Sequence, residues 1–184
     1  MSVIRRSRRR RPDGSAAGQS MAEFALVAPI FFLLVFAVIQ LGMVFSAQDG
    51  LVDGVRTAAR RADTYRINEA SFDNQVWPSI CQAIKDEINA RLHDRVIGYN
   101  PARLTRTLSY EWVQNPESGD YFLVAHIAAT YQNQLYVPLV SAFLDRTDGT
   151  VDNFLTLTAS EQMRIENPAL QPSTIPPPAP PACP

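Results

Sequence analysis

The chain has 184 residues, of which 46% are hydrophobic, and its 17 Lys and Arg nearly balance 18 Asp and Glu. Six arginines stand among the first eleven residues, whereas the chain beyond Ser46 carries 11 basic and 16 acidic side chains. This asymmetry excludes a globally basic nucleic-acid binder, so we expect no nucleic acid as a partner. Two Cys and two His are too few for a Cys/His zinc module or a disulfide-dense scaffold.

An apolar segment, residues 24–45, follows the arginines and contains no charged side chain. As a helix it spans roughly 33 Å, enough to cross a hydrocarbon core of about 30 Å. A cleavable secretory signal has a shorter apolar region and a small residue near its cleavage site, where this chain has Phe45. We therefore expect a transmembrane helix that acts as a signal anchor.

The charges that flank this span predict its orientation. The arginines all precede it, whereas Asp49 and Asp53 follow it closely. By the positive-inside rule, residues 1–18 form a basic cytoplasmic leader and the C-terminal domain is extracytoplasmic. The prediction is a single-pass protein of the cell (inner) membrane, with membrane lipid as one of its partners.

Glu23 is the ionisable residue that adjoins the apolar segment. An ionisable group at a membrane is costly enough to be a functional candidate. An acid in the first turn of a helix also complements the helix dipole, which gives a purely structural interpretation. Composition alone gives the two interpretations equal weight.

The residues around Glu23 resemble a known family. The stretch Gly18-Gln-Ser-Met-Ala-Glu-Phe-Ala-Leu-Val-Ala-Pro29, with the apolar run and Val38-Ile-Gln-Leu-Gly42, is similar to the TadE-like pseudopilins of tight-adherence (Flp) pilus assembly systems. The resemblance is specific over residues 14–62, and residues 155–166 also resemble the family. One departure is Gln40, where relatives often carry an acid.

The resemblance implies a processing site and an assembly role. A prepilin-type peptidase would cut between Gly18 and Gln19, which leaves Glu23 fifth and Phe24 sixth in the mature chain. Because Gly18 has no side chain, we expect its backbone to be drawn extended into the protease. The new ammonium at Gln19 would lie on the same helical face as Glu23. The resemblance implies that this assembly carboxylate pairs with an amine and so registers the subunit in a filament. It also implies other pilin-like subunits and an inner-membrane assembly platform as partners.

The helix is expected to continue beyond the span, so that residues 19–66 form one pilin-like helix. Pro29 inside the span removes a backbone donor and predicts a kink, although proline is also simply tolerated in membrane helices. Apolar residues recur at helical spacing over residues 47–66, while Gly50 and Gly54 weaken that helix.

Residues 67–167 predict an extracytoplasmic α+β domain. A second, amphipathic helix starts at about Ser79 and ends before Gly98, with Lys85 and its charged neighbours on a solvated face. Alternating apolar residues over 107–112, 123–131 and 154–164 predict strands. The fold class is therefore α+β and membrane-anchored, with the second helix packed on a small antiparallel sheet of three or four strands.

Residues 168–184 hold eight prolines and predict a disordered, extended tail, either a spacer or a docking ligand. Cys81 and Cys183 face an oxidising compartment in the predicted topology. They could form one disulfide that ties the tail to the second helix, or remain two free thiols.

No catalytic, cofactor-binding or metal-ligating set is predicted. His126 and Asp145 are the residues that a membrane-tethered hydrolase would have to use, and no substrate suggests itself. Asp145, Asp148 and Asp152 lack the alternating ligand spacing of an EF-hand, so a turn accounts for them better. We therefore expect a non-enzyme.

The leading hypothesis is a TadE-like minor pilin for pilus assembly or a related secretion machine. The alternative is an uncleaved membrane-anchored accessory or adhesin-like envelope protein.

Overall fold

The computed structural model describes residues 14–65, 67, 76–145, 149, 152–165 and 180–183. The leading arginines, and all of the predicted tail except residues 180–183, lie outside the described residues. The chain divides into two compact units, Met1–Val38 and Ile39–Pro184. The division falls inside the first helix, so that the second unit includes the helical residues from Ile39 onward.

Helix α1 comprises Gly14–Thr64, which makes it 51 residues long. It begins five residues before the expected start at Gln19 and continues without a break through Pro29. Near its C-terminal end, the Thr64 hydroxyl donates a hydrogen bond to the carbonyl oxygen of Arg61. The predicted long N-terminal helix is therefore confirmed.

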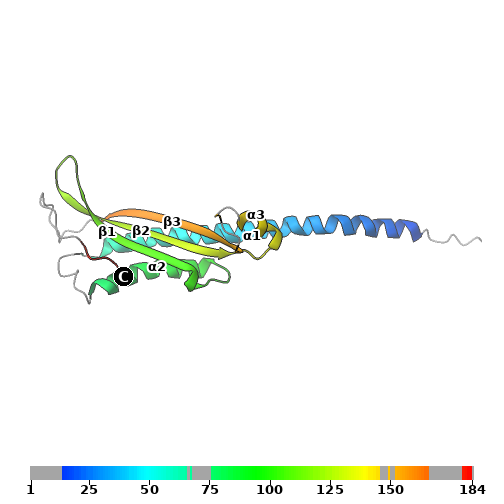
Figure 1. Ribbon diagram of the computed structural model, residues 1–184, viewed down its shortest axis with the longest axis horizontal. Helices are drawn as coiled ribbons and strands as arrows, with labels where there is room; N and C mark the ends of the chain where they lie inside the picture. Colours follow the sequence, from blue (N-terminus) through cyan, green and yellow to red (C-terminus); the bar gives the residue numbers. More distant parts are fainter. Residues whose placement is uncertain are drawn as a thin grey trace, which may run out of the picture. The chain divides into compact units, whose positions relative to one another are not determined.

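Helix α2 comprises Val76–Arg95 and runs antiparallel to the later part of α1 (Figure 1). It begins three residues before Ser79, because Pro78 sits in the first turn, where no backbone donor is needed. The chain leaves the helix through Gly98, whose φ of 71° suits glycine. An ion pair between Arg61 and Glu87, at 2.9 Å, joins the two helices.

Small residues let α1 and α2 approach each other closely. A Cβ at Gly54 would lie 3.1 Å from Ile88 Cα, and one at Gly50 would lie 3.0 Å from Arg95 Cβ. The sequence suggested that these two glycines would weaken the helix. Gly54 makes room for the backbone of Ile88, and Gly50 makes room for the Arg95 side chain. Their spacing of four residues continues to Ala58 and Ala62, both fully buried.

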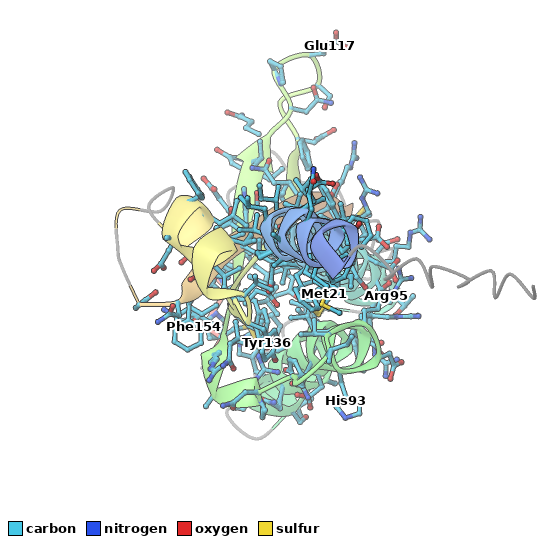
Figure 2. The ribbon with its side chains drawn as sticks, turned by 90° about the vertical axis from the view of Figure 1, so that its right-hand side faces the viewer. Met21, His93, Arg95, Glu117, Tyr136 and Phe154 are labelled. Carbon is cyan, nitrogen blue, oxygen red and sulfur yellow. A yellow bond between two sulfur atoms is a disulfide. The ribbon has the colours of Figure 1, made fainter. Side chains whose placement is uncertain are left out.

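The described residues of the second unit also form three strands: β1, Leu104–Gln114; β2, Tyr121–Gln134; and β3, Phe154–Ile165. They form one antiparallel sheet in the order β1-β2-β3, as the sequence predicted. A tight hairpin joins β1 to β2, and Figure 2 shows Glu117 at its tip. The short 3₁₀ helix η2, Pro101–Arg103, precedes β1, and helix α3, Pro138–Leu144, lies between β2 and β3.

The core lies between the helices and one face of the sheet. Leu108 pairs with Ile127, and Tyr131 pairs with Leu157, so that their side chains share the covered face. The helical contribution comes from both helices and consists of Val44, Ala47, Leu51, Val55, Ala58, Ala59, Ala62, Trp77, Cys81, Ile84, Ile88 and Leu92. The α+β prediction is therefore confirmed, while α3 was not predicted.

Candidate functional site

The segment around Gly18 is helical. Gly18 lies near the start of α1, is exposed, and has no outside atom within 4 Å of the position that a Cβ would take. In the free chain this backbone is part of the helix that begins at Gly14. The predicted extension concerns the chain when it is bound in the peptidase. A peptidase that cuts after Gly18 would have to unwind this turn. Glycine reduces that cost, since it stabilises a helix less than alanine by roughly 1 kcal/mol.

Gln19 and Glu23 are neighbours on the helix surface. Gln19 Nε2 donates a hydrogen bond to Glu23 Oε1 at 3.0 Å, and both residues are exposed. This is the contact that a spacing of four residues favours on a helix. A carboxylate has several acceptor sites, so Glu23 can still receive a cation from its own chain or from a neighbour.

The apolar side chains beyond Glu23 lie outside the core. Phe24 is exposed, as is Pro29. The exposed large apolar side chains that follow are Leu26, Val27, Ile30, Phe31, Phe32, Leu33, Leu34, Val35, Phe36, Val38, Ile39 and Leu41. In the part of the chain that the structure describes, α1 is the one helix long and apolar enough to cross a membrane. An apolar surface of this size is unfavourable in water, so α1 fits a membrane anchor.

Gln40 behaves differently from its apolar neighbours. Its exposed fraction is 0%, and its Oε1 accepts a hydrogen bond at 2.8 Å from the backbone N–H of Tyr136, just beyond β2. Its Nε2 has no hydrogen-bond partner among the described residues. Within the second unit, this hydrogen bond therefore joins the turn of α1 around Gln40 to the segment just beyond β2. The sequence singled out this residue only as a departure from the family pattern.

His126 and Asp145, the residues considered for a hydrolase, have separate structural surroundings. His126 Nε2 lies 3.5 Å from Glu111 Oε2 on the neighbouring strand. Asp145 is buried beyond α3 and accepts hydrogen bonds from the backbone N–H groups of Asp152 and Asn153. It therefore holds the residues just before β3. Asp148, part of the predicted turn, lies outside the described residues. No group of three or more His, Cys, Asp or Glu suited to a metal ion occurs among the described residues.

Cys81 and Cys183 form a disulfide, with their Cα atoms 5.7 Å apart. This is the bonded one of the two alternatives that the sequence left open. The Trp77 indole N–H also donates to the carbonyl oxygen of Pro181, at 3.0 Å. Residues 180–183 are thus held against the start of α2 by a covalent bond and a hydrogen bond.

Two buried polar side chains have shifted pKa values. Lys85 is only 9% exposed, so the prediction that it lies on a solvated face was wrong. Burial lowers the pKa of its ammonium, and the Arg106 charge lowers it further. Burial raises the pKa of the Tyr110 hydroxyl, whose oxygen has no hydrogen-bond partner among the described residues.

The comparisons with known proteins concern the segment just described. Residues 18–60 match the family model described as TadE-like protein. No curated protein and no solved structure matches the chain. The match begins at Gly18 and covers Glu23, the apolar helix and the glycine positions that pack against α2. Residues 18–60 therefore form a TadE-like domain, as the sequence resemblance indicated.

Proposed function

We propose that this chain is a TadE-like minor pilin or pseudopilin, a non-enzymatic membrane subunit for assembly of a tight-adherence (Flp/Tad) pilus or a related secretion machine. The observation that carries the proposal is the family match over residues 18–60, on a helix whose first part is exposed and apolar. The TadE-like domain supports a Tad pilus-associated, minor pilin-like protein. The family also suggests interaction with pilus assembly components in general.

The exposed apolar part of α1 gives the proposal its physical basis. Side chains such as Phe32 and Leu34 need an apolar environment that the described part of the chain does not supply. Lipid supplies it while the subunit is in the membrane. Helices of other pilin-like subunits on the assembly platform would supply it after incorporation, because the same surface can pack against apolar helices.

The proposed topology has the N-terminus in the cytoplasm and the second unit outside the inner membrane. Its support is the positive-inside charge pattern around the span. The disulfide between Cys81 and Cys183 also supports an oxidising compartment for the second unit, since such bonds are rare in the cytosol.

Processing after Gly18 would change the electrostatics of the helix start. It would remove the arginines and leave an ammonium on Gln19, whose side chain already contacts Glu23 at 3.0 Å. A carboxylate that enters an apolar helix bundle is costly unless it is paired. We infer that Glu23 pairs with such an ammonium, its own or a neighbour's, and thereby fixes the register of the subunit.

Mass spectrometry of the membrane-extracted chain tests processing directly. We expect a mature terminus at Gln19 in cells with a prepilin-type peptidase and the intact arginine-bearing terminus in cells without it. Gly18→Leu should block the cut because the side chain crowds the scissile backbone. Gly14→Leu, a glycine outside the proposed site, is the matched control and should be cut normally. An intact terminus in both kinds of cell would contradict processing and favour the uncleaved accessory protein.

A second experiment separates the assembly carboxylate from the cutting step. Glu23→Ala and Glu23→Gln should both be cut after Gly18, and both should fail to enter filaments purified from the cell surface. Glu23→Gln keeps the size of the side chain and its capacity for hydrogen bonds, so it isolates the charge. Normal incorporation of Glu23→Gln would show that ion pairing is not the role of Glu23.

A further inference from the structure

The second unit has an apolar surface at the end of the sheet where β2 terminates. Four large side chains are exposed there: Phe45 on α1, Ile97 after α2, Tyr136 after β2 and Phe143 on α3. Phe45, Ile97 and Phe143 have exposed fractions of 70%, 71% and 79%. We call these four residues the collar.

Hydrogen bonds place most of the collar residues beside the same short stretch of α1. The Tyr136 hydroxyl donates to the carbonyl oxygen of Ile97 at 3.3 Å, and the Tyr136 N–H donates to Gln40. Ser46, next to Phe45, donates through its hydroxyl to the carbonyl oxygen of Arg95 at 3.0 Å. Figure 2 shows Tyr136 between α3 and the end of α2 that carries His93 and Arg95. The segments that carry Phe45, Ile97 and Tyr136 thus meet around residues 40–46 of α1. Helix α3, which carries Phe143, follows Tyr136 directly in the chain.

Helix geometry predicts the depth of this level. If the hydrocarbon core of about 30 Å begins at Phe24, about 20 helical residues cross it, and it ends at about Met43. Gln40 then lies about 5 Å inside the hydrocarbon. Whatever hydrogen-bonds to Gln40 must reach that depth, and its partner is the backbone of Tyr136. The complete burial of Gln40 agrees with this placement, because a polar side chain at that depth must be shielded from lipid.

Along α1, the first charged residue beyond the collar is Asp49, about one turn after Phe45. Arg95 pairs with Asp49, and it also lies 3.6 Å from Asp53. The order along α1 is therefore apolar up to Phe45 and ionic from Asp49 onward. This is the order of environments that a bilayer presents, with aromatic residues at the boundary and charges in the headgroup layer.

We propose that the collar inserts into the bilayer surface, with Phe45, Ile97, Tyr136 and Phe143 in contact with lipid at the boundary between acyl chains and headgroups. The proposal rests on the membrane anchoring proposed above. The surface is continuous with the span through Phe45, and that continuity indicates lipid as the occupant. Contact between the collar and lipid fixes the distance of the second unit from the bilayer. The hydrogen bond between Gln40 and the Tyr136 backbone sets the same distance, because it holds the segment after β2 at the level of Gln40 on α1.

Quenching of tryptophan fluorescence by brominated lipids tests the depth of the collar. The full chain is placed as single copies in bilayer nanodiscs, with bromines either near the headgroups or deep in the acyl chains. Ile97→Trp and Phe143→Trp report on two separate collar segments, Phe36→Trp reports on the span, and Val76→Trp is the matched exposed control. Val76 begins α2, so about 19 helical rises, roughly 28 Å, separate it from the end of that helix. The parent chain, with Trp77 and Trp112, sets the baseline.

We expect strong quenching of both collar reporters by the shallow bromines, quenching of Phe36→Trp by the deep bromines, and no quenching of Val76→Trp. If Phe36→Trp is quenched but both collar reporters are as unquenched as Val76→Trp, the collar does not contact lipid. That result would overturn the collar proposal and keep the membrane anchor, and it would indicate that another protein chain covers the collar. No quenching at any position, Phe36→Trp included, would overturn the anchoring itself. Quenching at only one collar position, or at Val76→Trp as well, would also overturn the collar as a defined surface.

Discussion

The two parts of α1 show how one continuous helix serves two surroundings. Up to Val38 its large side chains, among them Phe31, Phe32 and Leu34, are exposed and belong to no core. From Ile39 onward it turns a stripe that is rich in alanine, with few large side chains, toward α2 and the sheet. The fully buried members of this stripe are Ala47, Leu51, Ala58, Ala59 and Ala62.

Side-chain size explains this difference. Large apolar side chains maximise the area that lipid or another helix can cover, which suits a segment without tertiary contacts. Ala and Gly let two backbones approach, which suits a segment that packs against α2. Gly54, which lies against the backbone of Ile88, is an example. The boundary between the two parts lies where Gln40 binds Tyr136.

A pair of isoleucines should give the largest contrast between the two parts. Ile88→Ala removes a fully buried side chain and should destabilise the second unit by about 2–5 kcal/mol. Ile30→Ala removes an exposed one from the span and should leave that stability unchanged. Both tryptophans belong to the second unit, so their fluorescence during thermal unfolding in detergent reports on it alone. Equal shifts for the two variants would contradict the separation of the units.

Loss of the disulfide should destabilise the second unit about as much as Ile88→Ala does. Cys183→Ser opens a link between residues 102 apart in sequence, and such links typically contribute about 2–4 kcal/mol. We expect a lower unfolding temperature and unchanged extraction by detergent. Cys81→Ser should match it, because either substitution breaks the same bond. A clear difference between the two variants would assign the effect to packing around Cys81 instead.

Two glycines on α1 test the close approach of the helices. Gly54→Leu places a side chain against the backbone of Ile88 and should cost about 1–3 kcal/mol of stability by overpacking. A Cβ at Gly42 would meet no outside atom within 4 Å, so Gly42→Leu should be tolerated. The unfolding temperature is again the measurement. Tolerance of Gly54→Leu would show that α1 and α2 can separate without loss of the fold.

Removal of the Tyr110 hydroxyl should have the smallest effect at neutral pH. Tyr110→Phe deletes a buried group without a hydrogen-bond partner and keeps the ring beside Trp77, so stability should change by less than about 1 kcal/mol, toward higher stability.

The same variant should differ from the parent at alkaline pH. Folding raises the pKa of Tyr110, so above its ordinary value of 10.0 the unfolded chain releases a proton that the folded chain retains. The parent should therefore lose stability as pH rises above 10, by up to about 1.4 kcal/mol per pH unit from this group. Tyr110→Phe should lack this loss of stability at alkaline pH.

The burial of Lys85 changes stability with pH in the opposite direction. Because its pKa is lowered in the folded chain, stability rises with pH up to about 10.5. Identical alkaline profiles for parent and variant would contradict the shifted pKa of Tyr110.

The sequence by itself determined the features that depend on local patterns. Uninterrupted apolar residues specified the long helix, alternation specified the strands, and the stretch from Gly18 to Pro29 indicated the family. Each of these follows from neighbours in the chain, so periodicity and composition are enough to find it.

Only the tertiary structure decided which residues come together across the sequence. It turned Gly50 and Gly54 from weak helix residues into the contact with α2, buried Lys85, and joined Cys81 to Cys183. It also paired Gln40 with the backbone of Tyr136, 96 positions away. Such contacts depend on how two segments dock, and their energies come from shared burial and hydrogen bonds that neither segment has alone.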